Sequence, residues 1–168
     1  MKRMICFLLI GILMITLCAC SQETKDSQIL FYYPRAEYKH GTPDGVITPE
    51  IHEISGHNDD LRYLLALYLQ GPSDPELCLP FPGGTTLVDM VQDEQQVTIT
   101  LSSTAALLEG IDLTIACACL AQTSFAVCDV PQVRIQSQAS TSGRLIDITF
   151  TRDNILLPGY EILPENPE

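Results

Sequence analysis

The chain has 168 residues, of which 21 are acidic and nine are Lys or Arg, so its formal net charge is −12 at pH 7. Nucleic acids and anionic bilayer surfaces are bound through clustered basic side chains, and this composition argues against both as ligands. The length is that of a single domain.

The N-terminal segment has the layout of a secretory signal peptide. Lys2 and Arg3 form a short positive head, and a mostly apolar run follows over residues 4–16. This run is too short for a helix that crosses a hydrocarbon core, which takes about 20 residues. We therefore expect it to direct export and to be removed.

The sequence LCAC at residues 17–20 resembles the bacterial lipobox, in which the last Cys is lipidated. The resemblance implies removal of residues 1–19 and transfer of diacylglycerol to the Cys20 thiol, which would hold the protein on the extracytoplasmic face of the cell membrane. The alternative is an ordinary secretory signal with incidental cysteines. The mature chain would keep seven basic and 21 acidic side chains, a net charge of −14, and would begin with a polar tether over residues 20–28.

Two strands are predicted next. Residues 29–33 (ILFYY) are aromatic and branched, which favours a strand. Residues 46–54 predict a second strand, and Pro49 within it suggests an edge position, because Pro cannot donate a ladder hydrogen bond.

A helix follows the two strands. Asn58 or Asp59 is expected to cap its N-terminus, and Gly71 with Pro72 forms its stop signal. Its apolar stripe, at helical spacing, consists of Leu61, Leu64, Leu65 and Tyr68.

The second half of the chain repeats the order strand, strand, helix and ends in two further strands. Strands are expected over residues 86–91, 96–101, 132–136 and 145–150, and a second helix over residues 111–127. The order β-β-α-β-β-α-β-β has few helical crossovers. It predicts an α+β fold in which both helices pack on one face of a mixed sheet.

Four segments resemble the GerM-type (GerMN) domain of spore-formation and germination lipoproteins. They are the aromatic strand with Tyr32 and Tyr33, residues 47–54 (ITPEIHEI), the helix end at residues 64–72, and the LPFPGGT loop at residues 79–85. The resemblance implies a domain over residues 29–152, with residues 153–168 as a C-terminal tail. It implies a non-enzymatic role linked to the spore envelope or cell wall, and it supplies no catalytic residues or cofactor.

Some positions depart from the family pattern. His52 stands where the family usually has Arg, Ser124 replaces a common Leu, and Cys128 lies in the linker after the second helix. No residue-level role is carried over from the family to these positions, and the expected fold is unchanged.

The segment from His52 to His57 is close to the zinc-protease pattern His-Glu-x-x-His. That pattern works because residues four apart share a helix face. Here the histidines are five apart, and Ser55 and Gly56 between them disfavour a helix. We therefore interpret the segment as a strand and a turn, with no metal site.

Four cysteines remain in the mature chain besides Cys20. Cys117 and Cys119 are two apart on the predicted helix, so they point to nearly opposite faces and are poorly placed to pair with each other. Cys117 is expected to be a small core residue. A disulfide elsewhere, Cys119–Cys128 or Cys78–Cys128, remains an open alternative.

The second helix suggests the main functional candidate. Asp112 is its only charged residue, and a helix that is apolar all round is normally covered all round. The candidate partner surface, on the side away from the expected sheet, consists of Ile115, Cys119, Gln122 and Ala126. Either residues 154–163 cover this side, or another protein does.

These observations favour a membrane-tethered, non-enzymatic binding or scaffold domain of the cell envelope. Its partner would be an envelope protein or a cell-wall polymer, with a possible connection to sporulation or germination. The alternative is an envelope hydrolase that acts on peptidoglycan or peptide, which a cluster of His and carboxylate side chains in a cleft would support.

Overall fold

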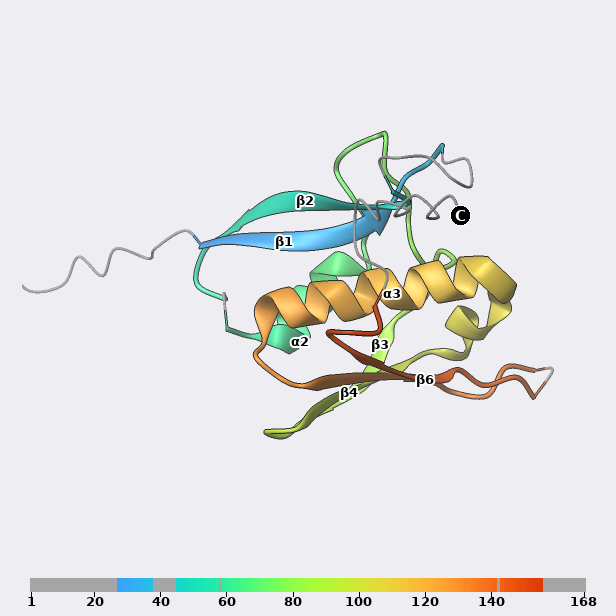
Figure 1. Ribbon diagram of the computed structural model, residues 1–168. Helices are drawn as coiled ribbons and strands as arrows, with labels where there is room; N and C mark the ends of the chain where they lie inside the picture. Colours follow the sequence, from blue (N-terminus) through green and yellow to red (C-terminus); the bar gives the residue numbers. More distant parts are fainter. Residues whose placement is uncertain (1–26, 38–44, 58, 142, 156–168) are drawn as a thin grey trace, which may run out of the picture.

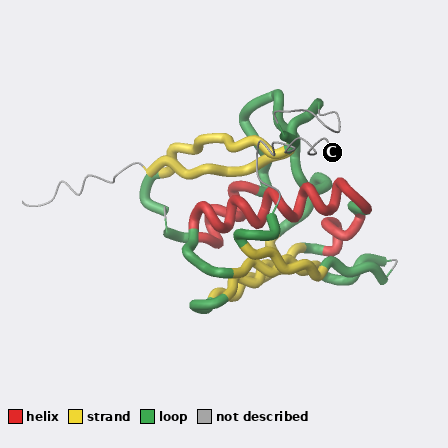
Figure 2. Tube along the Cα trace, viewed as in Figure 1, coloured by secondary structure: helices red, strands yellow, loops and turns green. Residues whose placement is uncertain are grey.

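The computed structural model describes residues 27–37, 45–57, 59–141 and 143–155. Its elements form three layers, in which a two-stranded sheet and a four-stranded sheet enclose the helices (Figures 1 and 2). The lipobox, Cys20 and most of the predicted C-terminal tail lie outside the described residues.

The upper layer is a hairpin of β1 (Ser27–Pro34) and β2 (Ile47–Ile54), which pair antiparallel. Because side chains alternate along a strand, one face of β1 carries Ile29, Phe31 and Tyr33 into the core, and all three are buried. Pro49 lies opposite Tyr32, and β2 is an edge strand. Both expected strands are thus confirmed, and β1 begins at Ser27, inside the segment that we assigned to the tether.

Helix α2 (Leu61–Tyr68) buries the predicted stripe of Leu61, Leu64, Leu65 and Tyr68. The expected cap is one residue early, because the carboxylate of Asp60 accepts the hydrogen bond from the Tyr63 N–H at 3.0 Å. Asn58 lies outside the described residues. Gly71 has a φ of +104°, the positive region that favours glycine after a helix.

The lower layer is a four-stranded sheet in the order β3-β4-β5-β6. Strands β3 (Leu87–Gln92) and β4 (Gln96–Leu101) form a hairpin, β5 (Gln132–Ser137) pairs parallel to β4, and β6 (Asp147–Thr151) pairs antiparallel to β5. One face is apolar, because Val97, Ile99, Val133 and Ile135 point from the central strands toward the helices and are fully buried.

A 3₁₀ helix, η2 (Ser103–Leu107), which the sequence did not predict, leads into α3 (Gly110–Val127). Helix α3 is long and apolar enough to span a membrane by length and composition alone. It runs between the hairpin and the four-stranded sheet, and every residue from Ile115 to Phe125 is buried (Figure 1). Within the described fold α3 is therefore the core helix of the domain.

The α+β class and the order of strands and helices are confirmed. The expectation of one mixed sheet is corrected, because the six strands form two sheets. Both helices pack on one face of the four-stranded sheet, and the β1–β2 hairpin covers them from the other side. The physical reason is the composition of α3, which has no polar face to turn toward water.

Hydrogen bonds fix the hairpin to the helices along β1. The N–H of Tyr32 donates to Oγ1 of Thr123 on α3 at 2.9 Å, and the hydroxyl of Tyr68 on α2 donates to the carbonyl oxygen of Tyr32 at 3.1 Å. The hydroxyl of Tyr33 donates to the carbonyl oxygen of Tyr68 at 3.1 Å, and the two rings stack 4.9 Å apart. Burial raises the pKa of both tyrosines, which keeps their hydroxyls protonated as donors.

The conformation of Gly71 gives the first prediction. A Cβ at this position would meet Cδ2 of Leu79 at 2.9 Å, in addition to the strain of positive φ. Gly71→Ala should therefore lower the free energy of unfolding by about 1 kcal/mol or more, measured by urea denaturation. Gly83→Ala is the matched control, since a Cβ there has no atom within 4 Å. Equal stability of the two variants would show that Gly71 is unstrained.

Candidate functional site

The two histidines of the zinc-like segment serve separate structural contacts. His52 lies on β2, where its Nε2 is 2.7 Å from Oε2 of Glu50, and Glu50 in turn accepts hydrogen bonds from the N–H groups of Ser73 and Asp74. His57 lies after the strand and stacks on the ring of Tyr63 at 4.3 Å. The expected strand and turn are confirmed. No group of three or more His, Cys, Asp or Glu side chains among the described residues is placed to hold a metal ion.

Two acidic side chains, of Asp60 and Asp93, also have structural roles. Asp60 caps α2, and the carboxylate of Asp93 accepts hydrogen bonds from the N–H groups of Gln95 and Gln96 in the β3–β4 turn, both at 2.8 Å. Four arginines, at the surface, form ion pairs with neighbouring acidic side chains: Arg62–Asp89, Arg134–Asp147, Arg144–Glu109 and Arg152–Asp129. Each of these charged side chains is paired with a neighbour, and the pairs do not converge on one cleft.

The four cysteines that the structure describes, Cys78, Cys117, Cys119 and Cys128, are free thiols. Cys117 and Cys119 are fully buried in the core, as expected for Cys117. Burial raises the pKa of the Cys117 thiol to about 12 and that of Cys119 well above its usual value. Thiolates are the reactive form, so neither residue is suited to nucleophilic chemistry. Cys78 and Cys128 are half-buried.

The predicted partner surface on α3 is corrected in most of its residues. Ile115, Cys119 and Gln122 are buried, at 4%, 0% and 7% exposure, and only Ala126 is exposed. The cover is the β1–β2 hairpin, which neither expected alternative included. A helix face covered by a hydrogen-bonded hairpin is not an accessible docking surface.

One of these four residues, Ile115, reaches a pocket of 180 Å³ near the N-terminal end of α3. This apolar pocket lies between the end of β1, the loop after α2 and the first turns of α3. Its lining consists of Pro34, Cys78, Leu79, Pro80, Leu108, Asp112, Ile115 and Ala116. The carboxylate of Asp112 is the only charged group in the lining.

Exposed apolar side chains continue from the apolar pocket onto the surface. Leu79 in the lining is 44% exposed, and Ile111, one helical turn before Ile115 on the same side of α3, is 51% exposed. Leu107, next to the lining residue Leu108, is 61% exposed. Several exposed apolar side chains around one pocket mark binding sites more often than single exposed side chains do.

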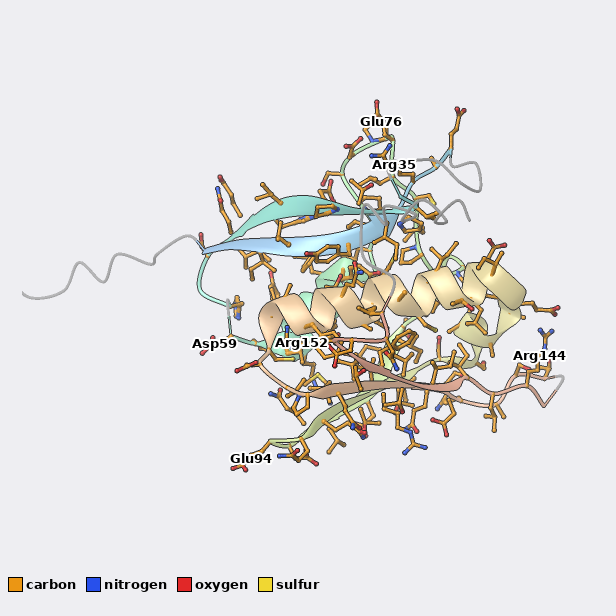
Figure 3. The ribbon with its side chains drawn as sticks, viewed as in Figure 1. Arg35, Asp59, Glu76, Glu94, Arg144 and Arg152 are labelled. Atoms are coloured by element: carbon orange, nitrogen blue, oxygen red, sulfur yellow. The ribbon has the colours of Figure 1, made fainter. Side chains whose placement is uncertain are left out.

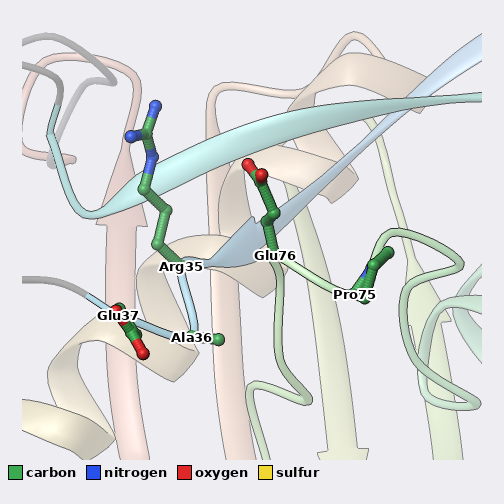
Figure 4. A pocket seen from close by; sticks show the side chains of 5 residues that line it. All are labelled: Arg35, Ala36, Glu37, Pro75 and Glu76. Carbon is green, nitrogen blue, oxygen red and sulfur yellow. The ribbon is translucent and has the colours of Figure 1, made fainter.

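A second cavity, of 330 Å³, lies just after the end of β1 and has charged side chains in its lining. Arg35 and Glu76 line it together with Ala36, Glu37 and Pro75, and the side chains of Arg35 and Glu76 rise on the same side (Figure 4). The Nε of Arg35 donates to Oγ1 of Thr48 at 2.9 Å, and the Ala36 N–H donates to the carbonyl oxygen of Glu76 at 2.8 Å. The first contact joins the end of β1 to β2, and the second joins it to the loop after α2, so both have a structural role.

Both cavities lie at the end of β1, away from the point where the chain enters the fold. Figure 1 shows β1 running from left to right toward the N-terminal end of α3. Asp59 and Glu94 lie at the opposite end, with Arg35 and Glu76 near the β1 end (Figure 3). The eight residues of β1 span about 26 Å, which is the approximate distance between the two ends of this strand.

Sequence reasoning found Ile115 but missed the rest of the apolar pocket. Leu79 comes from the loop after α2, and only folding brings it beside α3. One signal was available, because the loop after α2 carries Leu77 and Leu79 among its prolines, and a polar loop has no need of them.

No protein-family model matches the sequence, and no curated protein matches it significantly. Solved structures do resemble the fold. The first GerMN domain of the sporulation protein GerM from Bacillus subtilis superposes with a TM-score of 0.57 at 11% identity, covering 76% of this chain and 99% of that one.

Two further structures are similar. The tandem GerMN domains of the same Bacillus subtilis protein give a TM-score of 0.52 at 18% identity, covering 74% of this chain and 43% of that one. A proposed lipoprotein from Clostridium perfringens gives 0.48 at 17% identity, with 81% and 94% covered. At these identities the likeness establishes the fold alone: the described residues have the fold of one GerMN domain, as the sequence resemblance implied.

Proposed function

We propose that this chain is a lipid-anchored, non-enzymatic domain of the cell envelope that binds an apolar segment of another envelope protein at the apolar pocket. The observation that carries the proposal is the apolar pocket, together with the exposed apolar side chains of Leu79 in its lining and of Leu107 and Ile111, each next in sequence to a lining residue. Burial of such a surface by a partner is favourable, because it removes apolar area from water.

The position of the apolar pocket suits a tethered receptor. If Cys20 carries the lipid, six residues separate it from β1, so the start of the strand lies at most about 25 Å from the membrane surface. The pocket is at the end of β1 that is farther from the tether (Figure 1). The tether and the proposed binding pocket are thus at opposite ends of β1, which suits a protein that holds a partner near the membrane.

The chemistry of the described residues supports binding in preference to hydrolysis. The two histidines, Asp60 and Asp93 are engaged in separate structural contacts. The thiols of Cys117 and Cys119 are buried. No observation among the residues described favours the hydrolase alternative. The likeness to domains of a sporulation protein supports a further proposal, that this envelope role belongs to spore formation or germination.

Ile111→Glu tests the pocket. Ile111 is half-exposed in the first turn of α3, where a carboxylate is favoured by the helix dipole, so the variant should fold normally. A photoreactive residue at position 107 should crosslink a specific partner on intact cells, and Ile111→Glu should reduce this capture by about tenfold, because a charge would be buried in an apolar contact.

Val91→Glu is the matched control, since Val91 is 60% exposed on β3, outside the pocket. It should leave the capture unchanged. If Ile111→Glu keeps full capture, or if both variants lose it equally, the apolar pocket is not the binding site.

The anchor has its own test. Because Cys20 ends the lipobox-like sequence, Cys20→Ser should abolish incorporation of labelled fatty acid, and the protein should leave the membrane fraction or remain unprocessed. Fractionation and metabolic labelling measure both effects. Fatty-acid label on the Cys20→Ser protein would contradict lipidation at this residue.

A further inference from the structure

We propose that the outer face of the β1–β2 hairpin rests on the membrane that holds the lipid anchor, so that β1 lies along the bilayer. This contact rests on the lipidation of Cys20 in the proposed function, and it adds a second interaction surface, which we call the hairpin face. The hairpin face is formed by side chains that point away from the helices: Gln28, Leu30 and Tyr32 of β1, and Pro49, Ile51 and Glu53 of β2.

The middle of the hairpin face is apolar. The register places Leu30 opposite Ile51 and Tyr32 opposite Pro49, and residues directly opposite in an antiparallel pair share one face. Leu30 is 37% exposed and Ile51 is 60% exposed. Pro49 is exposed as well, and Tyr32 is half-buried. The exposed apolar side chains thus lie side by side, as a patch and not as isolated residues.

The outer face of the four-stranded sheet provides a contrast within the same molecule. Its central positions are polar: Thr98, Thr100, Arg134, Gln136, Asp147 and Thr149. The side-chain amide of Gln136 donates to Oγ1 of Thr100 at 2.8 Å, and Arg134 donates to both carboxylate oxygens of Asp147 at 2.7 Å. A sheet face that meets water is normally polar in this way. The hairpin face departs from the pattern, which indicates that it meets something other than water.

The membrane is the occupant that the tether supplies. The hairpin is an outer layer of the fold, and the tether joins it at the start of β1 (Figure 1). Only six residues separate Cys20 from β1, which is a reach of at most about 25 Å. A surface attached so closely has an effective concentration in the millimolar range, so a modest apolar contact is sufficient. Burial of Leu30 and Ile51 in the interfacial region supplies this contact.

The contact does not depend on the net charge of the chain. An acidic protein is not drawn to an anionic bilayer by electrostatic attraction. Glu53 is the only charged residue of the hairpin face, and it lies opposite Gln28, at the end of the face nearest the tether. The apolar centre therefore reaches the bilayer without a cluster of carboxylates. A zwitterionic bilayer fits this face best, and added salt should change the contact little.

This orientation brings the apolar pocket close to the membrane. Pro34, the last residue of β1, lines the pocket, so a hairpin that lies along the bilayer holds the pocket beside the same surface. The class of partner that fits is a membrane-bound protein whose apolar segment lies next to its own anchor.

The chain contains no tryptophan, so a single introduced Trp reports on its own surroundings. Ile51→Trp places it on the hairpin face. Val91→Trp is the matched control, because Val91 is also 60% exposed and lies opposite Thr98 on the outer face of the four-stranded sheet. Each full-length lipoprotein is reconstituted at one copy per nanodisc, in phosphatidylcholine with or without brominated acyl chains, which quench nearby Trp fluorescence.

Brominated lipid should roughly halve the emission of the Ile51→Trp protein and change that of the Val91→Trp protein by less than about a tenth, because a docked apolar face lies about 5–10 Å into the boundary of headgroups and acyl chains. Leu30→Glu added to Ile51→Trp should remove most of the quenching, since a charge would enter the apolar contact. Val88→Glu, at a similar exposure of 41% on β3, should leave the quenching unchanged.

Equal quenching of the Ile51→Trp and Val91→Trp proteins would overturn the inference. So would an Ile51→Trp emission that shifts to the blue only when several copies share a disc, because a second copy would then cover the hairpin face. Fatty-acid labelling separates this failure from that of the proposed function. Labelled protein without quenching removes the membrane contact and leaves the proposed function in place, whereas unlabelled protein removes the anchor and the contact together.

Discussion

Helix α3 has to be covered from two sides, and the rest of the structure is arranged around this constraint. Asp112 is its only charged residue, and the residues from Ile115 to Phe125 are buried. One sheet can cover only one side of a helix. The four-stranded sheet takes one side, and the β1–β2 hairpin takes the other, where hydrogen bonds from Tyr68 and to Thr123 hold the backbone of Tyr32 in place.

The same arrangement explains why a pocket exists. The hairpin follows α3 only as far as Pro34, and the first turn of α3 projects beyond this cover, with Ile111 exposed and Ile115 buried one turn later. The loop after α2 partly fills the gap with Leu79 and Pro80. The apolar pocket is thus the uncovered end of a helix that is otherwise enclosed, which is why its walls are apolar on an acidic protein.

Local patterns in the sequence were sufficient to predict the helices and strands. They were not sufficient to predict how these elements pack together. The stripe of α2 and the alternation along β4 are set by neighbours within a few residues, and both were predicted correctly. The division into two sheets depends on contacts between β1 and α3, about 90 residues apart in the chain. The cap of α2 is Asp60, and the sequence predicted its neighbour Asp59. The two residues are equally suitable by type, and only backbone geometry distinguishes them.

The candidate site shows the same limit. Composition correctly indicated that α3 has no polar side, and from this the sequence predicted either an internal cover or a partner for the face with Cys119 and Gln122. The periodicity of one helix cannot identify what lies against it. The hairpin supplies the cover for most of that face, and it leaves the end near Ile115 open toward the apolar pocket.

The central claim is that the hairpin is held on the helices through Tyr68 and so encloses α3. Its most direct test is the free energy of unfolding of Tyr68→Phe compared with that of Tyr63→Phe, an exposed tyrosine on the same helix. The account predicts a loss of about 1–3 kcal/mol for Tyr68→Phe, since the carbonyl oxygen of Tyr32 loses its partner, and a change within about 0.5 kcal/mol for Tyr63→Phe. Equal stabilities of the two variants would contradict it.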